Sequence, residues 1–189
     1  MHETFKCYDL RKERGDFANF LKGNGIDIGC GPDPLKVDKG TVRPWDLPDG
    51  DAQLMAGVPD ASFDFVYSSH CLEHMRDVPE SLKNWLRILK PGGILYVVVP
   101  DYMLYEKFTW PSRYNADHKQ SFSFMITRQH TQRTNHWHMN FDMYPLLTEL
   151  GAEPLRMTVE DKGYNYNAGV YDQTEFDALA QLCVVARKK

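Results

Sequence analysis

The sequence lacks the features of a secreted, disulfide-bonded or membrane-spanning protein. It has only four cysteines, with no C-x-x-C pair among them, which excludes a zinc-knuckle spacing and a compact disulfide framework. Its first residues contain no apolar signal core, and no hydrophobic run approaches the length of a membrane span. We therefore expect a cytoplasmic protein with reduced thiols and no membrane insertion.

The sequence also lacks a large excess of charge of either sign. The formal net charge of −4 over 189 residues provides no general attraction to nucleic acids or anionic membranes, so neither is an expected partner. Low-complexity tracts, internal repeats and linkers rich in Pro, Gly or Ser are absent as well. We expect one domain over residues 1–189, long enough to bury roughly 70% of its unfolded surface. The sequence does not indicate an oligomeric state.

The most informative stretch is residues 25–32, Gly-Ile-Asp-Ile-Gly-Cys-Gly-Pro. Ile26 and Ile28 suit a buried strand, while Gly29 and Gly31 allow unusual backbone angles close to a ligand. A strand followed by a glycine turn indicates a nucleotide pocket. A dinucleotide-binding turn needs a third glycine at position 34, where this chain has Pro34, so NAD is disfavoured.

Asp27, followed by Gly29 and Gly31, resembles motif I of the class I S-adenosylmethionine-dependent methyltransferases. The resemblance continues with Leu-Glu-His at 72–74, after an apolar strand, and with Leu-Lys-Pro-Gly-Gly at 89–93, before another. These matches follow one another in the family's order over roughly residues 24–101. The chain is similar to the small members of the family that act on metabolites and glycans.

This resemblance implies an α/β fold: a three-layer sandwich around a mostly parallel seven-stranded sheet whose last strand is antiparallel. It also implies S-adenosylmethionine as the cofactor, methyl transfer as the reaction and a small-molecule or glycan acceptor. Pro32, Pro34 and Gly40 predict that the helix usually found after the first strand is shortened or replaced by a loop.

The resemblance also assigns a cofactor site at the carboxyl ends of the first strands. An acidic residue ending the second strand would bind both ribose hydroxyls; we expect Asp46 by its spacing, with Asp38 as the alternative. A short third strand near residues 50–54 would meet the adenine. The expected cofactor-binding residues are Asp27, Gly29, Cys30, Gly31, Asp46, Asp51, Ala52, Ser69 and His70.

Hydrophobic periodicity predicts the remaining elements. Amphipathic patterns indicate helices over residues 8–22, 79–89 and 141–150. Residues 154–160 and 179–186 have the composition of two final strands, which the family arranges as an antiparallel pair.

Residues 102–139 form a long aromatic segment with little periodicity, which we interpret as a substrate-binding loop or lid. Within it, His118 is our first candidate for a general base that takes a proton from an acceptor hydroxyl, with Asp117 and His74 behind it. Neighbouring side chains on an extended segment point apart, so Asp117 need not orient His118. The most consistent reaction is O-methylation.

Two other functions remain open. His70, Glu73 and His74 match an inverted zinc-peptidase motif, which would make the protein a zinc-dependent hydrolase. That motif must lie within a helix, whereas here it follows a strand directly, so we expect no metal ion. The second alternative is a non-catalytic subunit that binds S-adenosylmethionine.

Overall fold

The computed structural model describes residues 3–124, 140–169 and 171–189. Its α-helices are α1 (Glu3–Lys6), α2 (Tyr8–Glu13), α3 (Asp16–Asn19), α4 (Val78–Ile88) and α5 (Met143–Glu149). Its strands are β1 (Gly23–Ile28), β2 (Gly40–Trp45), β3 (Phe63–Ser69), β4 (Leu89–Pro100), β5 (Ser121–Ser123), β6 (Asn140–Asp142), β7 (Ala152–Glu160) and β8 (Gln181–Lys188). Short 3₁₀ helices form at η1 (Leu72–His74) and η3 (Gln173–Phe176). None of these described helices is both long and apolar enough to cross a bilayer.

The main sheet has the strand order β2-β1-β3-β4-β8-β7. Strands β1 to β4 pair in parallel, and β8 runs antiparallel to both β4 and β7. The expected antiparallel last strand is therefore confirmed. The expectation of seven strands is wrong for the described residues, which form a six-stranded sheet.

The strand missing from the expected count is the one near residues 50–54. There the Oδ1 atom of Asp51 accepts a hydrogen bond from Gln53 N at 2.7 Å, and Asp51 O accepts one from Met55 N at 2.9 Å. These local bonds close turns, which compete with strand formation. Asp51 and Ala52 consequently lie in a loop.

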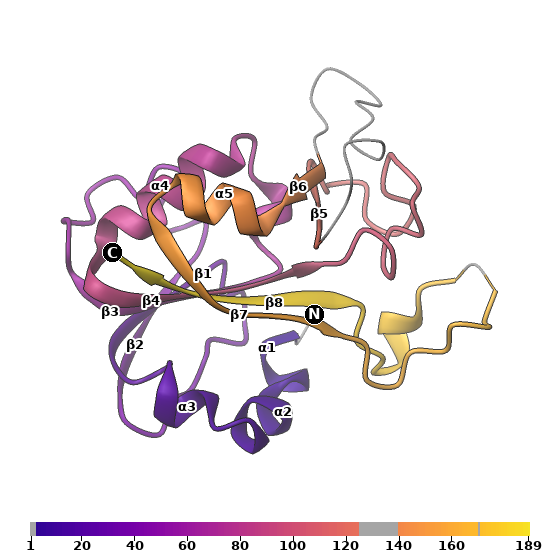
Figure 1. Ribbon diagram of the computed structural model, residues 1–189, viewed down its shortest axis with the longest axis horizontal. Coiled ribbons are helices and arrows are strands. Elements are labelled where there is room, and N and C mark those ends of the chain that lie inside the picture. The colour runs from indigo at the N-terminus through magenta and orange to yellow at the C-terminus, as the bar shows by residue number, and fades with distance from the viewer. Residues whose placement is uncertain (1–2, 125–139, 170) are drawn as a thin grey trace.

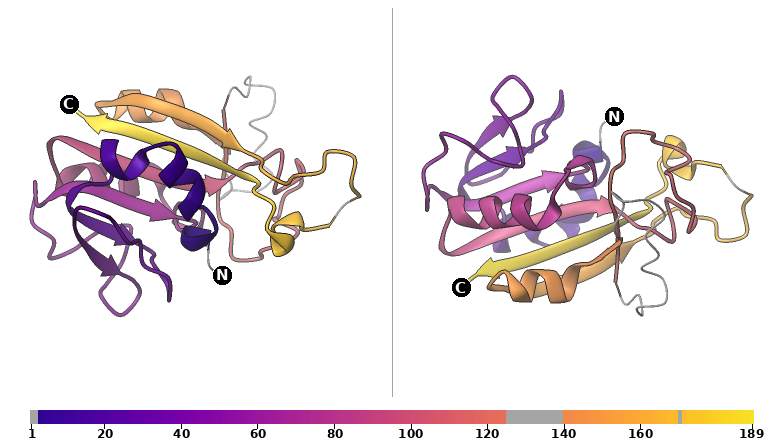
Figure 2. Two further views of the ribbon diagram at one scale, coloured as in Figure 1. Left: turned by 90° about the horizontal axis from the view of Figure 1, so that it is seen from below. Right: turned by 90° about the horizontal axis from the view of Figure 1, so that it is seen from above.

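Helices cover both faces of the sheet, with α4 and α5 on one and α1 to α3 on the other (Figures 1 and 2). Because successive side chains along a strand point to opposite faces, each face of the sheet has its own hydrophobic core. Ile26 and Ile28 of β1 are buried with the α4 side, whereas Phe65 and Tyr67 of β3 are buried with the α3 side. The buried sheet thus forms a rigid base for the loops at its edges.

Helix α4 matches the predicted amphipathic helix. Asp77 caps its first turn by accepting a hydrogen bond from Glu80 N at 2.9 Å. Its predicted apolar stripe is buried, and the indole of Trp85 also donates to Ala52 O at 2.8 Å. Residues 90–93 lie within β4, which begins at Leu89, and they form an irregularity in its pairing with β3.

The predicted leading helix over residues 8–22 is divided. Gly15 adopts a left-handed conformation with φ of 72°, so α2 ends before it and α3 begins after it. By contrast, α5 and the antiparallel pair β7 and β8 form close to their predicted positions. The described loop 29–39 contains no helix, as its prolines predict.

The carboxyl ends of β1, β3 and β4 lie at one edge of the sheet, because these strands are parallel. Residues 101–120 leave the sheet at this edge, as does the connection 161–180 between β7 and β8 (Figure 1). The two segments pack together through Leu104, Tyr105 and Ala180. Of the expected loop 102–139, residues 125–139 lie outside the described residues.

Candidate functional site

The glycine turn after β1 has a shape that only glycine allows at its first position. Gly29 has a φ of 76°, and a Cβ atom there would lie 2.5 Å from the side chain of Cys71. Gly31 has a φ of 53° but open space around it. Gly29 N donates to Trp45 O at 2.8 Å, which attaches the turn to the end of β2. The turn therefore brings bare backbone to the edge of the sheet.

Asp46 lies directly after β2, next to this turn. Its Oδ2 atom accepts a hydrogen bond from Gly31 N at 2.6 Å, and its Oδ1 atom accepts one from Leu47 N at 2.7 Å. Asp38 precedes β2 and so lies toward the opposite edge of the sheet. The structure brings Asp46, and not Asp38, to the glycine turn.

Asp27 is buried in β1, where its Oδ2 atom accepts a hydrogen bond from Leu35 N at 2.7 Å. This bond ties the loop after the glycine turn back to the strand. Burial raises the pKa of the Asp27 carboxyl to about 7. Asp27 therefore supports the turn from within β1.

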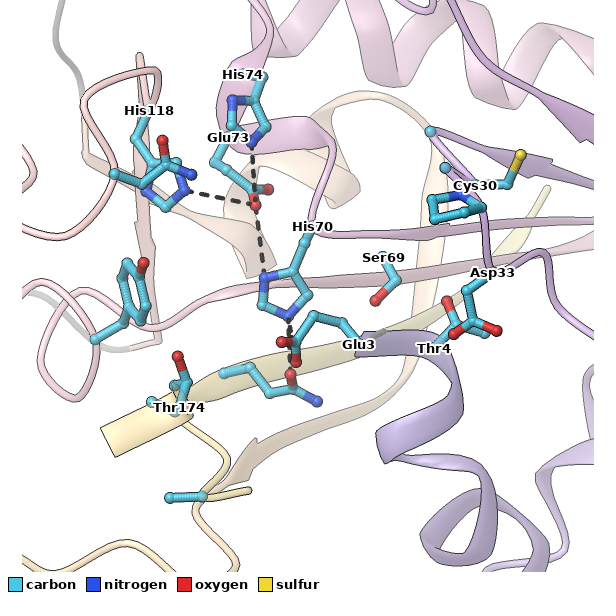
Figure 3. A pocket seen from close by; sticks show the side chains of 18 residues that line it. Glu3, Thr4, Cys30, Asp33, Ser69, His70, Glu73, His74, His118 and Thr174 are labelled. Atoms are coloured by element: carbon cyan, nitrogen blue, oxygen red, sulfur yellow. Dashed lines mark hydrogen bonds and ion pairs between the residues drawn. The ribbon is translucent and has the colours of Figure 1, made fainter. Parts of the chain in front are cut away.

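Two cavities meet at the carboxyl edge of the sheet, and Gly29, His70 and His74 line both. The smaller, of about 280 Å³, lies over the glycine turn and the end of β3 (Figure 3). The larger, of about 610 Å³, lies over the end of β2. Predicted site residues that line only the smaller cavity are Cys30, Gly31, Ser69 and His118. Those that line only the larger cavity are Asp46, Asp51, Ala52 and Asp117.

His70 follows β3 with a φ of 54°, and its amide donates to Val98 O at 2.9 Å. Its Nε2 atom lies 2.9 Å from Oε1 of Gln181. The Gln181 amide donates through Nε2 to Glu160, which also pairs with Arg14, so its oxygen is left to accept from His70. Nδ1 of His70 thus carries a lone pair. Burial lowers the pKa of this imidazole, which favours its neutral form.

Glu73 lies in η1 with its side chain 1% exposed. Within the described structure neither carboxylate oxygen has a hydrogen-bond partner, and burial raises the pKa of this carboxyl to about 8. Glu73 O accepts hydrogen bonds from Lys119 N at 2.8 Å and Gln120 N at 3.1 Å. These backbone bonds bring the segment around His118 against η1.

Each of two histidines beside Glu73 is oriented by a carboxylate. Nδ1 of His118 lies 2.7 Å from Oε1 of the buried Glu106, and Nδ1 of His74 lies 2.9 Å from Oδ2 of Asp117. Carboxylates accept hydrogen bonds, so both Nδ1 atoms are the protonated nitrogens. Asp117 consequently orients His74 and not its neighbour His118, as expected for adjacent side chains.

The remaining nitrogens of these histidines face Glu73. Its Oε1 atom lies 3.9 Å from Nε2 of His74 and 3.9 Å from Nε2 of His118, and 3.6 Å from Nδ1 of His70. Figure 3 shows the three imidazoles pointing toward this one oxygen. All three separations exceed a hydrogen bond. The cavity therefore contains a cluster of lone pairs around a buried carboxylate.

The structure shows two site residues that the sequence analysis missed. Glu106 orients His118, and Gln181 orients His70. Neither lies in a motif: Glu106 follows an aromatic run, and Gln181 begins a strand. The zinc-peptidase motif also lacks its required α-helix, because η1 is a 3₁₀ helix and His70 lies before it.

Comparison with known proteins identifies the family. Residues 2–168 match the family model described as a methyltransferase domain. A demethylmenaquinone methyltransferase of Tropheryma whipplei is 32% identical over 101 residues, covering 46% of this chain and 40% of the relative. The match thus spans less than half of that relative's length.

Two solved structures show the same fold. An S-adenosylmethionine-dependent methyltransferase of Thermotoga maritima has a TM-score of 0.55 with 20% identity, and the match covers 100% of both chains. A [4+2]-cyclase has a TM-score of 0.55 with 16% identity, covering 95% of this chain and 80% of that chain. The fold alone therefore does not determine the reaction. Because the family model covers most of the sequence, the chain belongs to the methyltransferase domain family, and family and fold imply S-adenosylmethionine as the cofactor.

Proposed function

We propose that this enzyme transfers the methyl group of S-adenosylmethionine to a hydroxyl group of a small polar molecule or glycan. The observation that carries the proposal is the pair formed by His118 and Glu106. Because the buried Glu106 holds Nδ1–H of His118, Nε2 has a free lone pair, and His118 lines the same cavity as the glycine turn. A hydroxyl acceptor needs such a base, whereas an amine does not.

In this proposal the cofactor extends over both cavities. Asp46 binds the ribose hydroxyls through carboxylate lone pairs not used by Gly31 N and Leu47 N. Asp51 and Ala52 meet the adenine in the larger cavity. The methionine part lies on the backbone of Gly29 and Gly31, where a Cβ atom at position 29 would collide with Cys71 and displace the turn. The remaining predicted residues, Cys30, Ser69 and His70, line this part of the site.

The bound cofactor supplies an electrophilic methyl group. The protein's task is then to hold the acceptor oxygen in line with it, which contributes up to roughly 7 to 11 kcal/mol. His118 accepts the hydroxyl proton at Nε2 while Glu106 keeps the imidazole in the required tautomer. His74, oriented by Asp117, forms the adjoining wall between the two cavities.

The acceptor enters, in this proposal, from a third cavity of about 890 Å³ beside the smaller one. Glu3, Tyr105 and Asn115 line both, so the two spaces adjoin. Aromatic and acidic side chains, including Tyr114, Asp172 and Phe176, line the third cavity, and this combination suits a hydroxylated ring. The name of the Tropheryma relative also supports a small-molecule acceptor.

The test compares hydroxylated and amine acceptors in an assay for the demethylated cofactor product. We expect turnover with a hydroxylated acceptor. The substitution His118→Asn should lower kcat with that acceptor about 10²-fold to 10⁴-fold and leave the Kd for S-adenosylmethionine unchanged. Arg113→Gln, an exposed change on the same segment, is the control and should retain activity. Full activity of His118→Asn on hydroxyl acceptors, or turnover of amines alone, would refute the proposal.

A further inference from the structure

We propose that Glu73, His74 and His118 form a binding site for one divalent transition-metal ion, with zinc preferred. The three side chains come from η1 and from the segment that Glu73 O holds against it. One oxygen or nitrogen from each lies within 4.8 Å of the others. This inference concerns metal binding and does not depend on methyl transfer.

The first argument is that two imidazole lone pairs meet at a buried carboxyl group that no residue of the described structure hydrogen-bonds. His74 and His118 donate hydrogen bonds from Nδ1–H to Asp117 and Glu106, which leaves a lone pair on each Nε2 atom. The third group is the Glu73 carboxylate, which has no hydrogen-bond partner in the described part of the chain. Lone pairs directed at one another in a buried space are stabilised by a cation between them, either a proton on Glu73 or a metal ion.

The second argument is distance. Zinc binds nitrogen and carboxylate oxygen at about 2.0 to 2.2 Å, so two ligand atoms of a tetrahedral site lie about 3.4 Å apart. Oε1 of Glu73 lies 3.9 Å from Nε2 of each histidine. Each Glu73–histidine pair is therefore about half an ångström from the spacing of two zinc ligands, and all three ligand atoms lie within 4.8 Å of one another. A direct hydrogen bond would require a closer approach of about 1 Å.

The third argument is the second layer of carboxylates. A histidine that binds a metal usually donates its other N–H to a carboxylate or carbonyl, which fixes the ring and increases its basicity. His118 does so to Glu106 and His74 to Asp117. Two such pairs beside one buried carboxyl group match the outer partners usually found around a metal centre.

Two imidazole nitrogens and one carboxylate suit zinc, cobalt(II) or iron(II), whereas Mg²⁺ and Ca²⁺ prefer oxygen ligands alone. The set leaves a coordination position for water or an acceptor hydroxyl. Nε2 of His118 can bind the ion or accept the hydroxyl proton, but not both. In the metal-free enzyme His118 is the base of the proposed function, and in the metal-bound form the proton of an acceptor hydroxyl held by the ion would pass to solvent.

The test uses the full chain, freed of metal with a chelator, and titrates it with Zn²⁺ by calorimetry and with Co²⁺ by visible absorption. We expect one equivalent of each to bind and Mg²⁺ not to compete. Glu73→Gln and His118→Asn should weaken Zn²⁺ binding at least 100-fold, and Glu106→Gln about 10-fold to 100-fold. Glu3→Gln, which changes another carboxylate of the same cavity, is the matched control and should bind normally.

Circular dichroism of each metal-free variant shows whether it is folded, and His74→Gln, at a partly exposed position, supplies a further ligand variant. No Zn²⁺ or Co²⁺ binding by the wild type would overturn the inference, as would binding that survives loss of Glu73 and of His118. Binding of S-adenosylmethionine and methyl transfer are measured on the same samples. A failure of the metal site is therefore distinct from a failure of the proposed function.

Discussion

At the scale of one residue, Asp27 shows how the surroundings of a carboxyl group determine what it does. Asp27 lies within β1, and its carboxylate accepts a hydrogen bond from Leu35 N instead of lining either cavity. Its link to the loop supports the glycine turn that Gly29 makes possible. Burial at this position disfavours the ionised form of Asp27, because a carboxylate is poorly solvated there.

This burial predicts a pH dependence of stability. The folded-state pKa of Asp27, about 7, lies above its ordinary value of 3.8. The folded protein therefore binds the proton more tightly than the unfolded chain, and this contribution to the free energy of unfolding is lost as pH rises from about 4 to about 7. The loss is at most about 4 kcal/mol.

Asp27→Asn removes this titration while retaining an oxygen that accepts from Leu35 N. Urea unfolding of both proteins is measured in buffers between pH 5 and 8. At each pH the difference between their free energies of unfolding isolates the effect of Asp27 from that of Glu73. We expect wild type to lose stability relative to the variant as pH rises. A difference in unfolding free energy that does not change with pH would contradict this assignment.

At the scale of elements, the helices α1 to α3 depend on contacts with the rest of the molecule. Each has six residues or fewer, too short to be stable alone. The fully buried Asp16 in α3 accepts hydrogen bonds from Arg156 of β7 at 2.5 and 2.7 Å, and from the hydroxyl of Tyr96 at 2.7 Å. This network attaches α3 to the sheet.

Asp16→Asn should lower the free energy of unfolding by about 3 kcal/mol, because it leaves the guanidinium of Arg156 without its anion. Chemical denaturation measures the loss. Glu153→Gln, which removes an ion pair with Arg187 that is half exposed on both sides, should change stability by less than about 1 kcal/mol. Equal effects of the two substitutions would show that the Asp16 network does not fix α3.

At the scale of the whole molecule, parallel topology decides which acidic residues share a site. β1, β2 and β3 run in one direction, so their carboxyl ends gather the glycine turn, Asp46 and His70 at one edge. Asp38, only eight positions before Asp46, lies before the start of β2. Proximity in sequence is therefore a poor guide to proximity at this edge.

Asp46→Ala should weaken binding of S-adenosylmethionine about 10-fold to 100-fold, since hydrogen bonds to a charged group contribute about 1.5 to 3 kcal/mol. Asp38→Ala should leave the affinity within about twofold. Calorimetric titration measures both, and Asp46→Asn, which can still accept from Gly31 N, separates ligand binding from support of the turn. A larger effect at Asp38 than at Asp46 would reverse the assignment.

Local patterns in the sequence were sufficient for the elements whose formation depends on neighbouring residues. The alternation around Ile26 and Ile28 predicts β1, and the apolar stripe around Trp85 predicts α4, because side-chain period directly reflects strand and helix geometry. The glycine turn and the order of motifs also indicated the family. By contrast, the third strand was not formed, because local turns at Asp51 competed with it.

Only the tertiary structure decided the arrangement of the candidate site. The sequence places Asp117 beside His118, yet the fold pairs His118 with Glu106 and gives Asp117 to His74. Backbone bonds from Lys119 and Gln120 to Glu73 bring these segments together, across more than 40 positions of chain. Such contacts depend on the packing of the whole edge and leave no periodic signal in the sequence. The sequence by itself thus determined the family, most of the strands and helices and the glycine turn, and the tertiary structure determined which side chains face one another around Glu73.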